Sequence, residues 1–376
     1  MTTSVDIINS TVPGLRNTFE DAFSTYNPFV KALLTKMVKE PTTGPYIEFN
    51  ILTGGPGRVT NLYGGAELLY TGKANIVEKG NEYPMRWDYS FGITGKDIDE
   101  IEDAKDNVVK KGKIADLLQA NHLAGITDVA SGFAQQFFMG NFSAGTNTRD
   151  NGSKGMVSLN GNTGVGYYSQ SSGTARTGIL EFAAPASQTG TVHNIPSKGA
   201  ASGAVDGWYN QYSVVTGSGD RRSVLRSTKS LCDRQGADRG ASIDFMFSDP
   251  ESRAAYVSDL TEHTMYGTVE SGKDPVTVKA REGLVFGGDK RCLWFDDDHI
   301  DITDSTCFPG AAAEGVTYML SSEDWRLFST TREKMFTWRK MVKNPFQDGY
   351  IQEMLFHFNM YCISRRTQAV VVGTAR

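Results

Sequence analysis

The sharpest candidate for chemistry in this sequence is the run Asp296-Asp297-Asp298-His299-Ile300-Asp301. Its carboxylate oxygens could bind a divalent cation, and the histidine could act as a base in a metal-dependent hydrolase. The run lacks the glycine and the terminal glutamate of a calcium loop, and consecutive carboxylates in a turn after a strand are usually solvated. We therefore assign no metal ligand, and keep a hydrolase that uses Asp296 to His299 as a remote alternative.

The other reactive residues form no recognised catalytic pattern. No two histidines have the i, i+4 spacing of a helical metal site, and the four cysteines have no repeated short spacing, which predicts reduced thiols. The glycine-rich runs Gly54–Gly57 and Gly161–Gly166 lack the lysine of a phosphate-binding loop and the strand–turn–helix context of a dinucleotide site. The sequence predicts no catalytic residue, no cofactor-binding residue and no cofactor, and thus a protein that is not an enzyme. The histidines are His122, His193, His263, His299 and His357, and the cysteines are Cys232, Cys292, Cys307 and Cys362.

Length and composition indicate an ordinary globular protein. The 376 residues suit two or three domains, or one large fold with insertions, and 39% hydrophobic residues can form a core. A net charge of −5 argues against a dedicated nucleic-acid-binding surface. The N-terminus lacks the pattern of a signal peptide and no apolar run approaches membrane-spanning length, so we expect a cytoplasmic protein without a membrane partner.

Two segments in the first hundred residues have the alternating pattern of β-strands. Residues from Tyr83 to Ile93 alternate strictly between apolar and polar side chains, as in a long strand, and Ile47, Phe49 and Ile51 indicate a second strand. About thirty glycine-rich residues separate the two, too many for a tight turn. The pattern predicts an extended two-stranded arm with a glycine-rich tip. Because an isolated ribbon is marginally stable in water, such an arm implies a partner surface.

Helical periodicity predicts two further elements, and a glycine-rich segment follows them. A helix broken near Pro28 is expected over residues 15–39, and a long helix with one apolar stripe over residues 105–139. Residues 141–205 are rich in Gly, Ser, Thr and Asn, which indicates loops with short strands around 179–182.

From about residue 206 the pattern changes to alternating helices and strands, which indicates an α/β or α+β body. We expect a helix over 223–235 and another that begins after Ser248, with Glu251 at capping-box spacing. Residues 321–325 are a further cap-like helix start. Strands are expected at 243–247, 275–279, 284–286, 291–295, 316–320, 354–362 and 369–372.

This order of elements resembles the Hong Kong 97 coat-protein fold of tailed-phage major capsid proteins. The resemblance is carried by loose patterns spread over nearly the whole chain: Tyr63–Leu69, Met85–Tyr89, Ile93–Ile98, Ile114–Leu118 and Cys362–Val370. It implies an α+β fold in which five segments have named roles. These are an N-terminal arm (1–45), an E-loop (46–95), a peripheral domain with a long spine helix (96–205), an axial α/β domain (206–320) and a return to the peripheral domain (321–376).

The resemblance also implies a function. It predicts a major capsid protein that assembles with copies of itself, in pentamers and hexamers, into the icosahedral head of a virion, formed in the host cytoplasm around phage DNA. Residues 1–45 are too short for an internal scaffolding domain, so a separate scaffold protein or none is expected, beside portal and decoration proteins and non-specific contact with DNA. The alternative is an encapsulin-like shell around a cargo enzyme.

Overall fold

The computed structural model describes residues 38–42, 47–52, 77–82, 85–94, 96, 179–217 without 190 and 194, 220–264, 284–286, 292–300 without 299, 314–330, 336–339, 342–343 and 349–375. Several expected features lie outside these residues. They are the helices over 15–37 and 105–139, the glycine-rich arm tip and the strand at 275–279.

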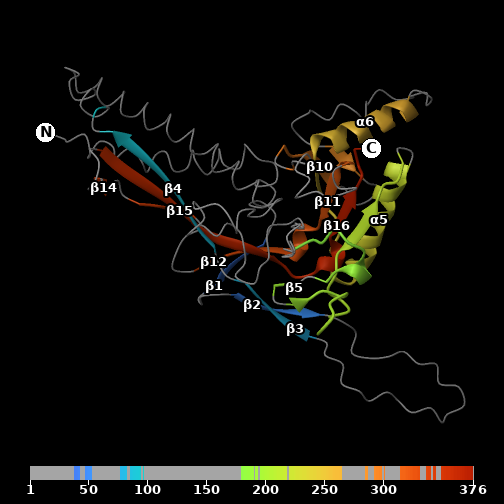
Figure 1. The fold of residues 1–376 in the computed structure, drawn as a ribbon, viewed down its shortest axis with the longest axis horizontal. Helices are drawn as coiled ribbons and strands as arrows, with labels where there is room; N and C mark the ends of the chain where they lie inside the picture. Colours follow the sequence, from blue (N-terminus) through green and yellow to red (C-terminus); the bar gives the residue numbers. More distant parts are fainter. Residues whose placement is uncertain are drawn as a thin grey trace, which may run out of the picture.

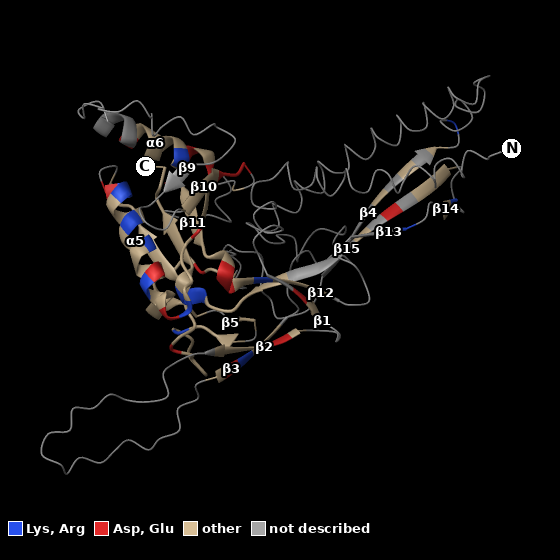
Figure 2. Ribbon diagram, turned by 180° about the vertical axis from the view of Figure 1, so that it is seen from behind, with Lys and Arg blue, Asp and Glu red and all other residues tan. Residues whose placement is uncertain are grey.

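A mixed six-stranded sheet forms one end of the molecule, seen from opposite sides in Figure 1 and Figure 2. β16 pairs with β7, and β10 with β8, in parallel, whereas β11 runs antiparallel to both of its neighbours. Four of the strands, at 243–247, 284–286, 291–295 and 316–320, lie where the alternation predicts them to within two residues. In sheet order the strands are β7 (Gln211–Val214), β16 (Ala369–Val372), β11 (Val316–Leu320), β8 (Phe245–Ser248), β10 (Cys292–Asp296) and β9 (Leu284–Phe286).

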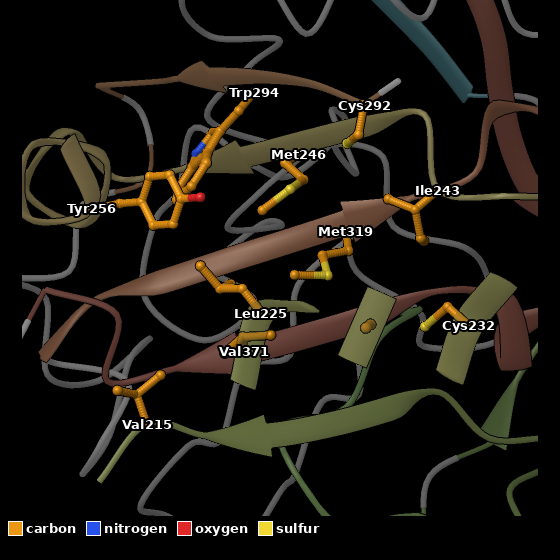
Figure 3. Packing of buried hydrophobic residues seen from close by; sticks show 11 residues of the cluster. Val215, Leu225, Cys232, Ile243, Met246, Tyr256, Cys292, Trp294, Met319 and Val371 are labelled. Atoms are coloured by element: carbon orange, nitrogen blue, oxygen red, sulfur yellow. The ribbon is translucent and has the colours of Figure 1, made fainter. Parts of the chain in front are cut away.

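Helices α5 (Arg221–Gln235) and α6 (Pro250–Thr264) pack on one face of this sheet. Leu225 of α5 and Tyr256 of α6 belong to one buried cluster with Met246, Met319 and Val371, which alternation places on the same face of three adjacent strands (Figure 3). The predicted helix at 223–235 is confirmed and begins two residues earlier. The two helices and this sheet form the α/β body that the sequence predicts.

The start of α6 differs from the expected capping box. The carboxylate of Asp249 accepts hydrogen bonds from the backbone N and the Oγ of Ser252, at 2.8 and 2.6 Å, so Asp249 is the capping residue and Pro250 follows at the first helical position. Ser248 is still in β8, where its Oγ accepts a hydrogen bond from Nε1 of Trp294 at 2.8 Å. The prediction of a Ser248–Glu251 box was one residue out because β8 continues through Ser248.

A second sheet is organised around the long strand β15 (Gly349–Cys362). Its C-terminal part pairs with β12 (Trp325–Thr330), which pairs in turn with β1 (Val38–Thr42). Its N-terminal part pairs antiparallel with β4 (Met85–Thr94) over ten positions, from Gly349 opposite Thr94 to Phe358 opposite Met85. The short strands β13 (Phe336–Trp338) and β14 (Val342–Lys343) also pair with β15. The strand predicted at 354–362 is confirmed and extends five residues further toward the N-terminus.

The two-stranded ribbon has a different partner strand from the one expected. β2 (Ile47–Leu52) pairs antiparallel with β3 (Val77–Glu82), from Ile47 opposite Glu82 to Leu52 opposite Val77. The alternating strand at 85–94 instead joins β15. The sequence Val-Glu-Lys-Gly-Asn-Glu of β3 has too few apolar residues to be recognised from periodicity.

Two further expectations are corrected by the chain path between the sheets. The cap-like residues 321–325 form one 3₁₀ turn, η6 (Ser322–Asp324), after which the chain enters β12 and not a helix. The C-terminal strand β16 lies in the first sheet, between β7 and β11. Val38 and Lys39, at the end of the helix expected over 15–39, lie in β1, where they pair with β12.

The segment before the body is held by turns rather than by strands at 179–182. Residues 179–182 carry no strand, and the first regular elements are the 3₁₀ turn η2 (Pro185–Ser187) and a two-residue hairpin of β5 (Thr191–Val192) and β6 (Ile195–Pro196). The short 3₁₀ turn η4 (Ala237–Arg239) lies between α5 and β8 in the chain. No helix among the described residues is both long and apolar enough to span a membrane.

Candidate assembly surfaces

The aspartate run after β10 does not form a metal site in its described part. Asp296 is exposed and ion-paired with Arg253, whereas Asp297 is buried and its backbone N donates to the carbonyl of Ser248 at 2.9 Å. Asp298 is exposed. Among the described residues no three His, Cys, Asp or Glu side chains converge as metal ligands do. His299 and Asp301, the other candidates, lie outside these residues.

Buried histidine and cysteine side chains near the described core have structural partners. His193 is 1% exposed, and its Nε2 accepts a hydrogen bond from the backbone N of Cys362 at 3.1 Å. Cys232, Cys292 and Cys362 are buried free thiols, and burial raises the pKa of each above its usual range. Thiols of this kind are poor nucleophiles, which agrees with the absence of a cysteine-based motif in the sequence.

The base of the β2–β3 ribbon packs against the second sheet and the β5–β6 hairpin through one aromatic side chain. The ring of Phe49 stacks on Tyr361 of β15 at a centroid distance of 4.1 Å and contacts the edge of His193 at 5.5 Å. The backbone N of Asn81 donates to the carbonyl of His193 at 3.2 Å. His193 adopts φ 54°, an uncommon conformation for a residue with a side chain, which these contacts stabilise. These contacts therefore hold the base of the ribbon against the second sheet and the β5–β6 hairpin.

Substituting Gly80 with alanine is expected to weaken the packing of Phe49 at the base of the β2–β3 ribbon. A Cβ on Gly80 would lie 2.7 Å from the ring of Phe49, which cannot move away because Tyr361 stacks against it. Such overpacking costs about 1–3 kcal/mol. Hydrogen–deuterium exchange should show faster exchange of residues 77–82. Gly92→Ala in β4 is the matched control, since its nearest new contact is 3.5 Å from the Tyr350 carbonyl, and equal exchange in both variants would contradict the prediction.

A second extended feature is the β4–β15 ribbon. In Figure 1 it runs away from the first sheet, with β14 beside its far end. The exposed fraction of Val342 in β14 is 64%, and the exposed fraction of Val77 in β3 is 49%; these are the two large apolar residues that the described part of the chain exposes most. Each lies singly on a separate extended ribbon, Val77 on the β2–β3 ribbon and Val342 beside the β4–β15 ribbon.

The chain passes between the two sheets at the turns η6 and η7, and these two crossings lie side by side. The turn η6 leads from β11 into β12, and the turn η7 (Arg365–Thr367) leads from β15 into β16. Thr367 donates through its Oγ1 to the carboxylate of Asp324, and the backbone N of Ile363 donates to the carbonyl of Asp324 at 2.9 Å. Burial raises the pKa of Asp324 above its usual range, against the effect of the Thr367 hydrogen bond and of Arg239. The two crossings form one hydrogen-bonded junction.

Gln368 closes the same junction from the other side. Its Oε1 accepts hydrogen bonds from the backbone N of Ser321 at 2.9 Å and from Nε1 of Trp325 at 3.0 Å. All three residues are buried. Buried hydrogen bonds favour one arrangement of the elements they join, so these contacts help to hold the two crossings together.

Arg365 ties the junction to the segment at 179–210. The side chain is fully buried, with Nε donating to the carbonyl of Ile179 at 2.6 Å and Nη1 to Oγ of Ser197 at 2.7 Å. Nη2 donates to Glu181 at 3.1 Å and to Asn210 at 3.0 Å. Sequence reasoning missed this network, because residues 179–210 have no periodicity. The one available signal is that Arg365 falls within the Cys362–Val370 pattern quoted above.

Comparison with known proteins gives a likeness in structure only. No protein-family model matches the chain, and no curated protein matches it in sequence. A chain of the cyanophage A-1(L) capsid asymmetric unit matches with a TM-score of 0.52 and 9% identity, covering 93% of each chain. A Mycobacterium phage Ogopogo chain matches with a TM-score of 0.48, 10% identity and 91% coverage of each chain. A chain of the holo-SrpI encapsulin complex from Synechococcus elongatus PCC 7942 matches with a TM-score of 0.46 and 10% identity, covering 93% of this chain and 88% of that one.

The likeness to the cyanophage chain concerns the course of the backbone, since nine residues in ten differ. It extends over both sheets and the body helices because it covers almost the whole of each chain. The mixed sheets and few described helices agree with the predicted α+β class. The chain therefore has the α+β fold of a phage capsid protein.

Proposed function

We propose that this protein is a major capsid protein, which assembles with copies of itself into the icosahedral head that encloses phage DNA. The observation that carries the proposal is the fold shared with the cyanophage capsid chain over 93% of both chains. Fold alone does not determine function. The extended ribbons support the same conclusion, because a shell subunit needs surfaces that neighbouring copies cover.

The parts of the subunit have corresponding proposed roles. The β2–β3 ribbon is the base of an E-loop that lies over a neighbour, and the six-stranded sheet with α5 and α6 is the axial domain, clustered in pentamers and hexamers. The second sheet, with β4 and β15, belongs to the peripheral domain. The head forms in the host cytoplasm and becomes part of the virion. A separate scaffold protein, a portal and decoration proteins are further proposed partners.

Assembly is the activity of such a protein, and its driving force is burial of apolar surface at repeated contacts. Modest interfaces, each weak alone, produce a stable shell when closed symmetry satisfies all of them together. No catalytic group is required. We accordingly propose that the protein is not an enzyme, with no cofactor and no metal.

Expression of the full chain tests this proposal. Negative-stain electron microscopy is expected to show closed shells of uniform size, and a variant in which an Asn-Gly turn joins Leu52 directly to Val77 is expected to stay soluble without forming them. Asn-Gly suits a two-residue hairpin, so β2 and β3 keep their pairing. Normal shells from the shortened variant would show that the E-loop role is wrong.

The content of the shell separates the main proposal from its alternatives. Particles purified from infected cells, or from cells that also express the scaffold and portal proteins, are expected to contain DNA. An encapsulin-like shell would instead co-purify with a cargo protein. Hydrolase activity that is lost in Asp297→Ala with assembly unchanged would favour the metal-dependent enzyme instead.

A further inference from the structure

The outer face of α5 carries only arginine and serine. Every exposed position between Arg221 and Leu231 is Arg226 or a serine, and Arg234 extends the same face by two turns. The opposite side of the helix is buried and includes Leu225 and Cys232. We call the outer side the basic face; its residues are Arg222, Ser223, Arg226, Ser227, Ser230 and Arg234.

The arginines of the basic face have no anionic partner in the described part of the chain. The inward cations of α5 are paired: Arg221 with Asp259 of α6, and Lys229 with Asp233 at 2.6 Å. No hydrogen bond or ion pair within the described residues involves the side chain of Arg222, Arg226 or Arg234, and Nε of Arg222 is buried without an acceptor there. Guanidinium groups bind carboxylates by charge-assisted, often bidentate hydrogen bonds. A carboxylate-bearing surface therefore fits this face.

The same chain exposes carboxylates on the opposite flank of the sheet. α5 contacts β7 and β16, at one end of the strand order, whereas α6 contacts β10 near the other end. Glu251, in the first turn of α6, is exposed, and so are Asp296 and Asp298 at the end of β10. We call these three residues the acidic rim. Figure 2 shows the blue residues of α5 along one flank and the red residues that follow β10 on the other side of the sheet.

Opposite charges on opposite flanks are what a head-to-tail ring requires. In such a ring every contact joins two different surfaces of the same chain, so the two surfaces must be complementary. A self-complementary, two-fold contact would instead bring like charges together, which costs several kcal/mol. We propose that the basic face of α5 docks against the acidic rim of the next copy in a ring of axial domains. This inference rests on the proposed function and names the surfaces that make the ring.

The proposal also gives a role to the aspartate run that the sequence singles out. Asp296 is held by Arg253 and Asp297 is buried, which leaves Asp298 and Glu251 as exposed carboxylates without an ion pair among the described residues. These two can accept the neighbour's guanidinium groups. The run then acts as one half of an interface rather than as a cation site.

Charge exchange across the interface tests this directly. The basic-face variant is Arg226→Glu with Arg234→Glu, the acidic-rim variant is Glu251→Lys with Asp298→Lys, and the exchanged variant carries all four changes. Each two-residue variant is expected to lower ring and shell yield on the order of tenfold or more at physiological salt, because like charges then face each other. The exchanged variant is expected to assemble again, because its surfaces are complementary once more. Sedimentation velocity and electron microscopy measure both outcomes.

Mixing the two two-residue variants gives an independent readout. In the basic-face variant both surfaces are acidic, and in the acidic-rim variant both surfaces are basic. Each variant can therefore bind only the other, and the two must alternate around a ring. Alternation closes rings with an even number of subunits, and we expect hexamers or tubes but no shells that need pentamers.

The exchanged variant also serves as the folding control, since it contains every substitution. Two-residue variants that assemble like the wild type, or an exchanged variant that is folded by circular dichroism but remains unassembled, would overturn the proposal. So would a basic-face variant that forms normal shells but packages less DNA, since the face would then bind nucleic acid. A wild type that forms rings without shells would overturn the proposed function alone, and one that stays monomeric would overturn both.

Discussion

Replacing Arg365 with methionine is expected to lower the free energy of unfolding of the subunit by about 3–5 kcal/mol. The guanidinium group is fully buried and donates to Ile179, Ser197, Glu181 and Asn210. Methionine fills a similar volume but leaves the carboxylate of Glu181, itself 3% exposed, without its cation. Urea unfolding at a concentration where the subunit is unassembled measures the loss. Fluorescence reports it locally, because the Trp208 ring lies 5.5 Å from the guanidinium.

Two variants separate the charge effect from the loss of packing. Arg366→Met is the matched control: Arg366 is the adjacent residue, is partly exposed, and has no hydrogen bond or ion pair among the described residues, so a change within about 0.5 kcal/mol is expected. Adding Glu181→Gln to Arg365→Met should recover part of the loss, since a buried amide costs less than a buried carboxylate. Equal losses for Arg365→Met and Arg366→Met would contradict the account.

Gly315→Ala is expected to cost about 2–5 kcal/mol, the sum of a strained backbone and a steric clash. Gly315 has φ 107° and precedes β11, where the backbone N of Gly373 donates to its carbonyl at 2.8 Å. A Cβ there would lie 2.3 Å from the backbone N of Ala375 and 2.4 Å from Oγ of Ser252. Since Ser252 takes part in capping α6, the clash would disturb the helix start as well.

Gly240→Ala provides the comparison. Gly240 also has positive φ, 74°, but a Cβ there would meet nothing within 4 Å. Its substitution carries the backbone strain alone, about 1 kcal/mol. Thermal unfolding of the two variants in parallel measures the difference, and a smaller loss for Gly315→Ala than for Gly240→Ala would show that the clash is relieved.

Strands with a clear apolar pattern could be predicted from the sequence. β11 lies at the residues expected, and β15 contains the whole segment predicted from its alternation. The pairing of strands could not be predicted in the same way, because periodicity shows which face a strand buries but not which neighbour it joins. For this reason β4 was expected beside β2, whereas it pairs with β15.

Polar networks were the least predictable part of the structure. Asp249 and Arg365 each satisfy several partners that are distant in sequence, such as Val316 for Asp249 and Ile179 for Arg365. No local pattern in the chain indicates such contacts, because they arise only when segments far apart in the sequence are brought together by the fold. The aspartate run was recognised in the sequence, but its place on the flank opposite α5 depends on strand order.

The uninterrupted strand β15 makes the subunit a mechanical lever. Its fourteen residues span about 45 Å without a loop, from beside β14 at the far end to the junction at Arg365. A tilt of about 5° at the junction displaces the far end by about 4 Å over that length. Small adjustments in the buried network are thus amplified at the far end of the ribbon, and a force on that end is transmitted back to the angle between the sheets.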